Sequence, residues 1–446
     1  MATTMRDSVV FLSVPGLRER DVAAMSNLRS IMAGGEIADL TPSFPCVTCP
    51  VQAAMATGAA ASGHGIVANG FYWRERRVAE MWTSPNGCIQ RPQLWELLAR
   101  QGLKTAVWFL LHSKDCRADY VCTPAPIHNP DGSESLWCYT RPDSLYGTLR
   151  DELGHFPLDH FWGPAAGLAS SRWIADSAVH AARRWRPNLF QVYLPHLDYA
   201  AQRSGPDSAA AQQAVAEFDE LLGALFGRLA EAYGASPLWL VAGEYAITPV
   251  DHVSYPNRVL REAGLLTVRD GGEGEQIDFE NSLAWAMVDH QFSHVFVQNR
   301  DAAAIRKIAE LFRRQPGIAE VLAGEDLPRY ELDHARSGEL VLISAPSSWQ
   351  AYYWWVDEER APPLARTIDI HRKPGYDPVE LQFDPATRSI PLDAALVKGS
   401  HGAPARDRSQ RTVMLSSEPG LLPDPTGMRD VDVFRVVARQ FGIEVE

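Results

Sequence analysis

Thr48 is the residue whose type and position most clearly suggest chemistry. It lies in the segment Pro45-Cys46-Val47-Thr48-Cys49-Pro50-Val51, which has the pattern of a helix start. A hydroxyl group at the start of a helix is a candidate nucleophile, and the first N–H groups of the helix can hold an anion such as phosphate. Threonine also caps many helices, so an isolated Thr-x-Pro is more often a structural cap than a catalytic residue.

Three polar residues that follow strand-like segments form a candidate metal site. They are Asp198, Glu244 and His401. Carboxylates and imidazole are common ligands of divalent ions, although each residue also has a structural reading as a helix cap or a loop residue. Cys46-x-x-Cys49 is a weaker candidate, because no second cysteine pair follows at zinc-ribbon spacing.

Further residues offer additional ligands or contacts to an anion. Asp369 and His371 alternate in a strand-like segment, so their side chains share one side, and the adjacent Arg372 suits an anionic substrate. His290 belongs to a group with neighbouring acidic and histidine residues, although a histidine in a strand is more often structural. Arg203 is a candidate phosphate contact that a surface position would also explain.

The elements that must position these residues follow from the apolar pattern. Strand-like runs at 9–14, 105–111, 189–194, 238–241, 295–297, 340–343 and 413–415 alternate with helical patterns at 92–100, 173–185, 209–233, 302–314 and 430–441. The alternation predicts an α/β fold with a mostly parallel sheet. Continuously apolar strands predict helices on both faces, and active sites of such sheets lie at the carboxyl ends of the strands.

Composition limits the partners of the chain. The 446 residues are 46% hydrophobic and 22% charged, as in a globular protein with a large core. The net charge of −13 argues against a nucleic-acid polymer or an anionic membrane as partner, whereas a local metal ion could still bind phosphate. No apolar run approaches the roughly 18 residues that span a bilayer, and no signal peptide is visible, so we expect a cytoplasmic protein.

In its motifs the chain resembles the nucleotide pyrophosphatase/phosphodiesterase branch of the alkaline phosphatase superfamily. In that family a nucleophilic threonine is followed by proline two residues later, by Thr-Gly nine residues later, and then by His-Gly-Ile and Asn. The residues that match in type and spacing are Thr48, Pro50, Thr57-Gly58, His64-Gly65-Ile66 and Asn69. Ser43 has a similar local sequence but lies five residues too far from Thr57-Gly58.

The resemblance implies a metal-dependent hydrolase of a phosphodiester or phosphate ester with an alkaline-phosphatase-like α/β domain over residues 1–446. Thr48 would form a covalent phospho-threonine, while Asn69 and the Thr48 backbone N–H would stabilise the phosphoryl oxygens. Two zinc ions would activate the threonine and water and stabilise the leaving oxygen. The implied partner is a small phosphate-containing substrate.

The metal-ligand positions of the family are only partly kept in this chain. Asp198 and His401 match, and Glu244 replaces an aspartate. The three remaining positions hold Pro15, Gln202 and Tyr245. The carbonyl of Gln202 is a poorer zinc ligand than imidazole. The resemblance implies one or two divalent ions, most simply zinc, and these ions would need other ligands in place of the three that are missing.

The candidate residues divide into three groups. The predicted catalytic residues are Thr48 and Asn69. The predicted metal ligands are Asp198, Glu244 and His401, with Gln202, Asp369 and His371 as supplementary candidates. The predicted substrate contacts are His290, Arg203 and Tyr245.

Two alternatives to a metal-dependent phosphate-ester hydrolase stay open. The first is a divergent enzyme with one metal or none, acting on a phosphonate, a sulfate or a specialised biosynthetic intermediate. The second is a non-catalytic protein that keeps an anion pocket. The 157-position separation of Glu244 and His401 exceeds what a sheet crossover needs, so we expect a capping subdomain over about residues 249–345.

Overall fold

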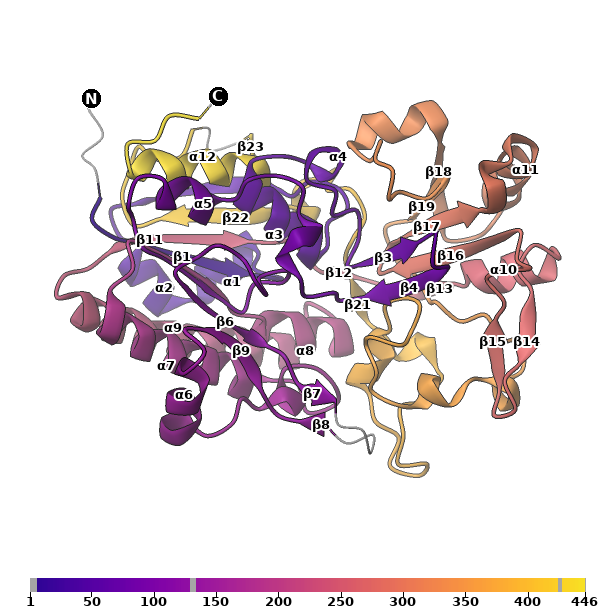
Figure 1. The fold of residues 1–446 in the computed structure, drawn as a ribbon, viewed down its shortest axis with the longest axis horizontal. Helices are drawn as coiled ribbons and strands as arrows, with labels where there is room; N and C mark the ends of the chain where they lie inside the picture. Colours follow the sequence, from indigo (N-terminus) through magenta and orange to yellow (C-terminus); the bar gives the residue numbers. More distant parts are fainter. Residues whose placement is uncertain (1–5, 129–133, 424–426, 446) are drawn as a thin grey trace.

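A nine-stranded sheet forms the centre of the larger lobe of the computed structural model, which describes residues 6–128, 134–423 and 427–445 (Figure 1). Its order is β23-β2-β22-β11-β1-β10-β5-β6-β9. The strands are β1 (Val9–Val14), β2 (Glu36–Thr41), β5 (Thr105–Trp108), β6 (Tyr120–Pro124), β9 (Cys138–Arg141), β10 (Leu189–Tyr193), β11 (Leu238–Gly243), β22 (Thr412–Ser416) and β23 (Met428–Arg429). The five strands from β11 to β6 are parallel, and antiparallel pairs flank them.

Helices cover both faces of this sheet. Because alternate side chains of a strand point to opposite faces, β1 buries Val10 and Leu12 in one core and Val9 and Phe11 in another. The first core is covered by α1 (Glu19–Ala24), α2 (Ser26–Ile31), α6 (Leu145–Leu153), α7 (Leu168–Trp185) and α9 (Ala209–Tyr233), and the second by α3 (Thr48–Thr57), α5 (Leu94–Ala99) and α12 (Asp430–Gln440). The predicted α/β fold with a mostly parallel sheet between two helical layers is confirmed.

A second lobe, on the right in Figure 1, contains a four-stranded antiparallel sheet. Its order is β16 (Ala284–Asp289), β17 (Phe292–Val297), β19 (Leu340–Ser344) and β18 (Ile318–Ala323). Helices α10 (Pro256–Glu262) and α11 (Ala302–Phe312) pack against it. Its core also contains Trp355 and Val397, so it extends beyond the predicted range of 249–345.

The remaining α-helices and paired strands are short. The helices are α4 (Ala61–His64) and α8 (His196–Ser204). The paired strands are β3 (Gly70–Trp73) with β4 (Val78–Met81), β7 (Ile127–His128) with β8 (Glu134–Ser135), β12 (Thr248–Pro249) with β21 (Gly399–Ser400), β13 (His252–Ser254) with β20 (Ser348–Gln350), and β14 (Val268–Asp270) with β15 (Glu275–Ile277). The pairing of β12 with β21 places the entrance and the exit of the second lobe side by side.

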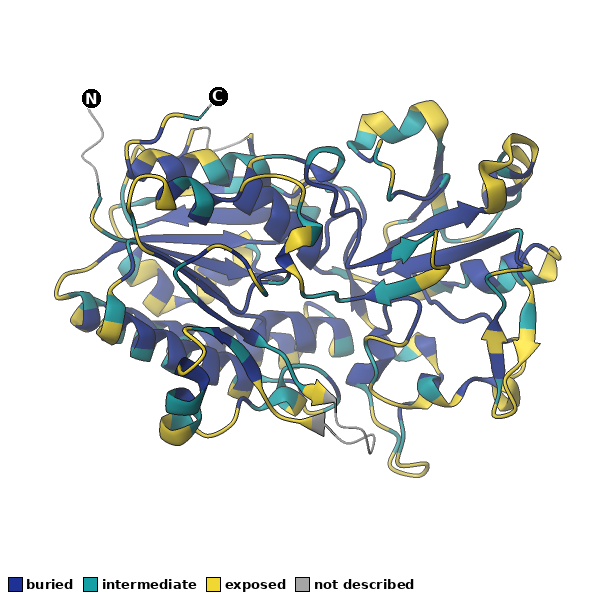
Figure 2. Cartoon of the chain, in the orientation of Figure 1, coloured by how far each residue is buried: buried dark blue, intermediate teal, exposed yellow. Residues whose placement is uncertain are grey.

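Burial follows this two-lobe plan. Figure 2 shows the strands of both sheets buried and the exposed residues on outer helices and loops. None of the helices in the described part of the chain combines the length and the apolar character that crossing a membrane requires.

Candidate active site

Thr48 is the first residue of α3. The preceding Val47 is extended, with φ −131° and ψ 161°, and its carbonyl accepts a hydrogen bond from Val51 N at 3.1 Å. Pro50 fits the third helical position because N–H groups in the first turn have no partner inside a helix. Thr48 is 4% exposed, so the start of this helix is enclosed by other parts of the fold.

A hydrogen-bond chain leads from Thr48 to a buried carboxylate. Thr48 Oγ1 lies 3.0 Å from the Tyr245 hydroxyl oxygen, and that hydroxyl donates to Asp198 Oδ1 at 3.2 Å. A tyrosine hydroxyl has one hydrogen to donate. Because Asp198 receives that hydrogen, Thr48 is the donor and Tyr245 the acceptor in the first bond.

Asp198, in the first turn of α8, is held from its other side as well. Its Oδ2 atom accepts a hydrogen bond from Gln202 Nε2 at 2.7 Å, and Gln202 Oε1 accepts one from the Tyr376 hydroxyl at 2.7 Å. Burial raises the pKa of Asp198 to about 7, and the bonds from Tyr245 and Gln202 oppose that rise. Both oxygens of the carboxyl group therefore have donors.

Four aromatic rings stack beside this carboxyl group. Tyr245 lies parallel to His401, with centroids 3.6 Å apart and planes 7° apart. The His401 centroid is 3.8 Å from that of His290, which in turn stacks on Tyr376 at 3.6 Å. All four residues are at most 3% exposed, so the stack fills the space around Asp198 with closely packed rings.

The two nitrogen atoms of His401 have different surroundings. Its Nδ1 atom lies 2.8 Å from the carbonyl oxygen of Cys46 and carries the hydrogen of that bond. Its Nε2 atom is 3.9 Å from Asp198 Oδ1 and has no hydrogen-bond partner among the described residues. Burial lowers the pKa of His401 well below its ordinary value, so the imidazole is neutral.

Asn69 is fixed between helix α3 and the second lobe. Its Oδ1 atom accepts a hydrogen bond from Cys49 N at 3.0 Å. Its Nδ2 atom donates to Asp289 Oδ1 at 3.1 Å, and its backbone N–H donates to Asp289 Oδ2 at 2.7 Å. His290 Nδ1 is 2.6 Å from the same carboxyl group, and burial raises the pKa of Asp289 to about 6. The amide nitrogen of Asn69 is thus oriented by a residue of β16.

Glu244, the residue after β11, lies apart from the Thr48 hydrogen-bond chain. Its Oε1 atom accepts hydrogen bonds from Ser13 Oγ at 2.7 Å and from Gln52 Nε2 at 2.8 Å. Its Oε2 atom is buried without a partner in the described chain. Burial raises the pKa of Glu244 to about 8, and the nearby charge of Asp198 adds to that rise.

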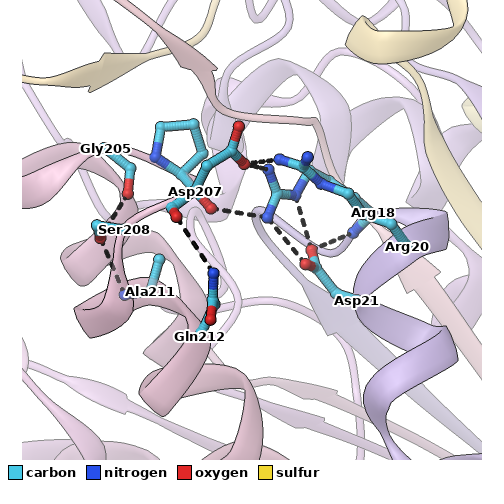
Figure 3. Close-up of polar contacts among 9 residues, drawn as sticks. Arg18, Arg20, Asp21, Gly205, Asp207, Ser208, Ala211 and Gln212 are labelled. Atoms are coloured by element: carbon cyan, nitrogen blue, oxygen red, sulfur yellow. Dashed lines mark hydrogen bonds and ion pairs between the residues drawn. The ribbon is translucent and has the colours of Figure 1, made fainter.

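Pro15, directly after β1, stands where the resemblance implies an acidic metal ligand. The following Gly16 has φ +76° and donates its N–H to the carbonyl of Tyr245 at 3.0 Å. Arg18 then binds Asp21 at 2.8 Å and Asp207 at 2.9 Å (Figure 3). The pair with Asp207 ties this turn to the loop before α9.

Three of the predicted residues lie outside this cluster. Asp369 forms an ion pair with Arg372, and His371 is exposed, with Nδ1 3.3 Å from the carbonyl of Met81. Arg203 Nε donates to the carbonyl of Leu381 at 2.9 Å. Asp369 and His371 therefore do not join Asp198 as ligands, because their segment forms a turn with local partners instead of the predicted strand.

The residues present do not fit the two-zinc centre that the resemblance implies. The described residues contain no group of three or more His, Cys, Asp or Glu side chains placed to hold a metal ion. Pro15 has no ligand atom in its side chain, both Asp198 oxygens accept hydrogen bonds, and Gln202 turns its amide nitrogen toward Asp198. Among the described residues, Asp198 lies 3.9 Å from His401 Nε2, and the third expected ligand that it contacts, Gln202, turns a hydrogen-bond donor toward it.

Sequence reasoning missed three residues that complete the cluster. Tyr376 supports Gln202, while Ser13 and Gln52 hold Glu244. Gln52 lies one turn after Thr48 in the predicted helix, which is a signal that could have found it. Tyr376 comes from a loop 174 residues after Gln202, and no local pattern marks it.

A family model described as type I phosphodiesterase / nucleotide pyrophosphatase matches residues 9–377. A search of curated protein sequences returned no match.

Several solved structures share the fold over almost the whole chain. Phosphonoacetate hydrolase from Sinorhizobium meliloti 1021, in complex with phosphonoformate, has a TM-score of 0.64 and 17% identity, covering 98% of this chain and 96% of that one. Human ectonucleotide pyrophosphatase / phosphodiesterase 5 has a TM-score of 0.64, 14% identity and the same coverage. An inactive form of the murine protein in complex with AMP has a TM-score of 0.63 and 14% identity, covering 99% and 96%.

Proposed function

Because the chain belongs to the type I phosphodiesterase / nucleotide pyrophosphatase family of hydrolases, we propose that it hydrolyses a small phosphate-containing ester with Thr48 as the nucleophile. The hydroxyl of Thr48, placed at the start of α3 and hydrogen-bonded to an acceptor, is the observation that carries the proposal. Thr48 is 4% exposed between the two lobes, which favours a small molecule over a polymer.

In the proposed reaction Thr48 Oγ1 attacks phosphorus, and the leaving oxygen departs on the opposite side. We assign the Thr48 backbone N–H, at the start of α3, to the developing negative charge, because the Cys49 N–H is already bonded to Asn69 Oδ1 and Pro50 has no N–H. The Asn69 amide has a second N–H besides the one bonded to Asp289, and we assign it to a phosphoryl oxygen. Water then releases the phosphoryl group from Thr48. The divalent metal expected from the family has no part in these steps, because the residues present do not fit it.

A phosphonate is a second substrate class within this proposal. One similar structure is that of a phosphonoacetate hydrolase in complex with phosphonoformate. In a phosphonate, as in a phosphate ester, the atom that Thr48 would attack is phosphorus. In that case the bond that breaks joins phosphorus to carbon. Phosphonoacetate therefore belongs in the substrate panel beside p-nitrophenyl phosphate and bis(p-nitrophenyl) phosphate.

The test is the detection of a covalent phosphoryl group on Thr48. We expect acid-quenched wild-type protein to gain the mass of one phosphoryl group, located on Thr48 by peptide mass spectrometry, and Thr48→Ala to gain none. Thr140→Ala is the matched control, because Thr140 is similarly buried, at 4% exposure, in the edge strand β9. Equal turnover by wild type and Thr48→Ala would contradict the proposal.

A binding protein without turnover is the second candidate. It is favoured by the Asp289 carboxyl group, which already accepts both the backbone N–H and the amide of Asn69 and so occupies donors that a phosphate would use. This candidate predicts that inorganic phosphate binds in calorimetry and that Thr48 never becomes phosphorylated.

A further inference from the structure

We infer that Tyr245 takes over the role of a metal ion at the nucleophile: it receives the proton of Thr48 and passes its own proton to Asp198. The inference rests on the proposed function, and it deepens that proposal by naming how Thr48 is activated. It makes the chain a metal-independent member of a family whose two-zinc centre it does not preserve.

The direction of the hydrogen bonds carries the inference. Tyr245 donates to Asp198 Oδ1 at 3.2 Å, and its oxygen lies 3.0 Å from Thr48 Oγ1. With its one hydrogen committed to Asp198, the Tyr245 oxygen can only accept from Thr48. Each of the two protons therefore already lies on the bond along which it would move, which is the geometry that general base catalysis needs.

Tyr245 is held rigidly in this position. Its ring lies flat on His401, with centroids 3.6 Å apart, and it is 1% exposed. His401 in turn is anchored to the carbonyl of Cys46, two residues before Thr48. A phenol packed in this way has no alternative rotamer to adopt without opening the core, so the contact with Thr48 is maintained.

Asp198 is fixed as the final acceptor by a second set of bonds. Gln202 Nε2 donates to its Oδ2 atom, and Tyr376 donates to Gln202 Oε1. Tyr376 also stacks on His290 at 3.6 Å. The two tyrosines thus support the same carboxyl group, one directly and one through the Gln202 amide.

The donor set disfavours a metal ion in the same place. A cation bound to Thr48 Oγ1 and Asp198 Oδ1 would have to displace the Tyr245 hydroxyl that now joins them. The Gln202 amide presents Nε2, a donor, to Asp198, and a cation at that position would face its hydrogens. Pro15 has no ligand atom in its side chain. These side chains can pass protons along their hydrogen bonds, and they do not supply the ligands that a two-metal site needs.

The proposed step balances in atoms and charge. As the Thr48 Oγ1–P bond forms, the ester P–O bond breaks, the Thr48 proton moves to Tyr245, and the Tyr245 proton moves to Asp198. In the second half water supplies the hydroxyl group to phosphorus, and the Thr48 oxygen recovers its proton through Tyr245 from Asp198. The leaving alkoxide or phenoxide takes its proton from solvent, which receives the corresponding proton from the released phosphate.

The experiment measures single-turnover formation of phospho-Thr48 with p-nitrophenyl phosphate after exhaustive chelation, with bound zinc counted by plasma mass spectrometry. We expect wild type to form the adduct without zinc and Tyr245→Phe to form it about 10²- to 10⁴-fold more slowly. Tyr233→Phe is the control, because it removes the hydroxyl of a partly buried tyrosine of α9, which donates to the carbonyl of Pro187 at 2.8 Å.

Asp198→Asn is a second variant that keeps the inference testable if Tyr245→Phe folds poorly. The Gln202 amide can turn over to present Oε1 to the new amide, so the cluster keeps its hydrogen bonds while the final proton acceptor is lost. We expect the same loss of rate as for Tyr245→Phe, and a solvent deuterium isotope effect on the wild type that disappears in both variants.

The outcomes separate the two proposals. Adduct formation that needs stoichiometric zinc, or that proceeds equally fast in Tyr245→Phe, overturns the Tyr245 role while leaving Thr48 as nucleophile. Absence of any adduct on wild-type Thr48, with or without zinc, overturns the proposed function and this inference together. Slow adduct formation confined to the Tyr245 and Asp198 variants supports both.

Discussion

At the scale of single residues, Glu244 combines complete burial with an incomplete set of hydrogen bonds. Ser13 and Gln52 donate to one oxygen, and the other oxygen has no partner in the described chain. An ionised carboxylate in such a place costs free energy, and protonation removes that cost. Glu244 is therefore neutral in the folded protein near pH 7, which agrees with its raised pKa.

The stability of the fold should depend on pH through this residue. The pKa of Glu244 is about 8 in the folded state, whereas an unfolded glutamate is ionised above pH 5. The native state binds the extra proton, so its free energy of unfolding falls as pH rises from 7 to 9. Relative to Glu244→Gln, the wild type should lose about 1.4 kcal/mol over that range.

Denaturant unfolding of the two proteins at pH 7 and pH 9 measures this difference, because other ionisable groups cancel in the comparison. If the difference in free energy of unfolding between wild type and Glu244→Gln is the same at pH 7 and pH 9, Glu244 is already ionised in the folded protein at pH 7.

At the scale of elements, the end of β11 is set by a close backbone approach. Gly243 precedes Glu244, and a Cβ atom there would lie 1.6 Å from Thr412 Oγ1 and 2.9 Å from the Leu17 carbonyl oxygen. Thr412, on the neighbouring β22, in turn donates to that same carbonyl at 2.6 Å. Glycine is required because three chain segments meet at this point.

Gly243→Ala should lower the free energy of unfolding by about 1–3 kcal/mol, the usual cost of overpacking. Adding Thr412→Ala removes the nearest clash, so the double variant should be less unstable than the sum of the two single variants. Gly227→Ala is the control with the opposite sign: a Cβ atom added at this position of α9 would have no atom within 4 Å, and we expect about 0.5–1 kcal/mol of stabilisation. Additive effects of Gly243→Ala and Thr412→Ala would contradict this packing.

Sequence patterns predicted the elements far better than the partners of the site residues. The expected strand at 9–14 and the helix at 209–233 agree with β1 and α9 residue by residue, because apolar periodicity is a local property. The strand that alternation predicted around Asp369 and His371 is wrong, because this segment forms a turn. Contacts such as Tyr376 with Gln202 join distant segments and depend on the folded chain.

At the scale of the whole molecule, the candidate site lies where the two cores meet. The core of the second lobe includes Phe44 and Val47, which lie four residues and one residue before Thr48. Phe44 contacts Phe292 of β17, with ring centroids 5.5 Å apart. Asn69 and Asp289 add hydrogen bonds across the same boundary. The lobes therefore share apolar and polar contacts at the nucleophile.

Phe292→Ala should destabilise the protein by about 3–5 kcal/mol, because Phe292 is fully buried. Since its contact with Phe44 supports the segment before Thr48, phosphorylation of Thr48 should slow as well. Phe383→Ala is the matched control, because Phe383 is 52% exposed and such substitutions usually change stability by less than about 0.5 kcal/mol. Chemical denaturation and adduct formation measure the two effects, and a stable Phe292→Ala variant would contradict the shared core.

The pairing of β12 with β21 has an evolutionary consequence. Thr248 pairs with Ser400 and Pro249 with Gly399 in a small two-stranded sheet, so the stretch of about 150 residues between them leaves the larger lobe and returns to it at one point. A segment whose two ends are neighbours can be gained, lost or exchanged by recombination without breaking the parent sheet. Exchange of this one insert could thus change the substrate range while Thr48, Tyr245 and Asp198 stay in the host fold, provided that the new insert again supplies groups that hold the site, as Asp289 and Tyr376 do here.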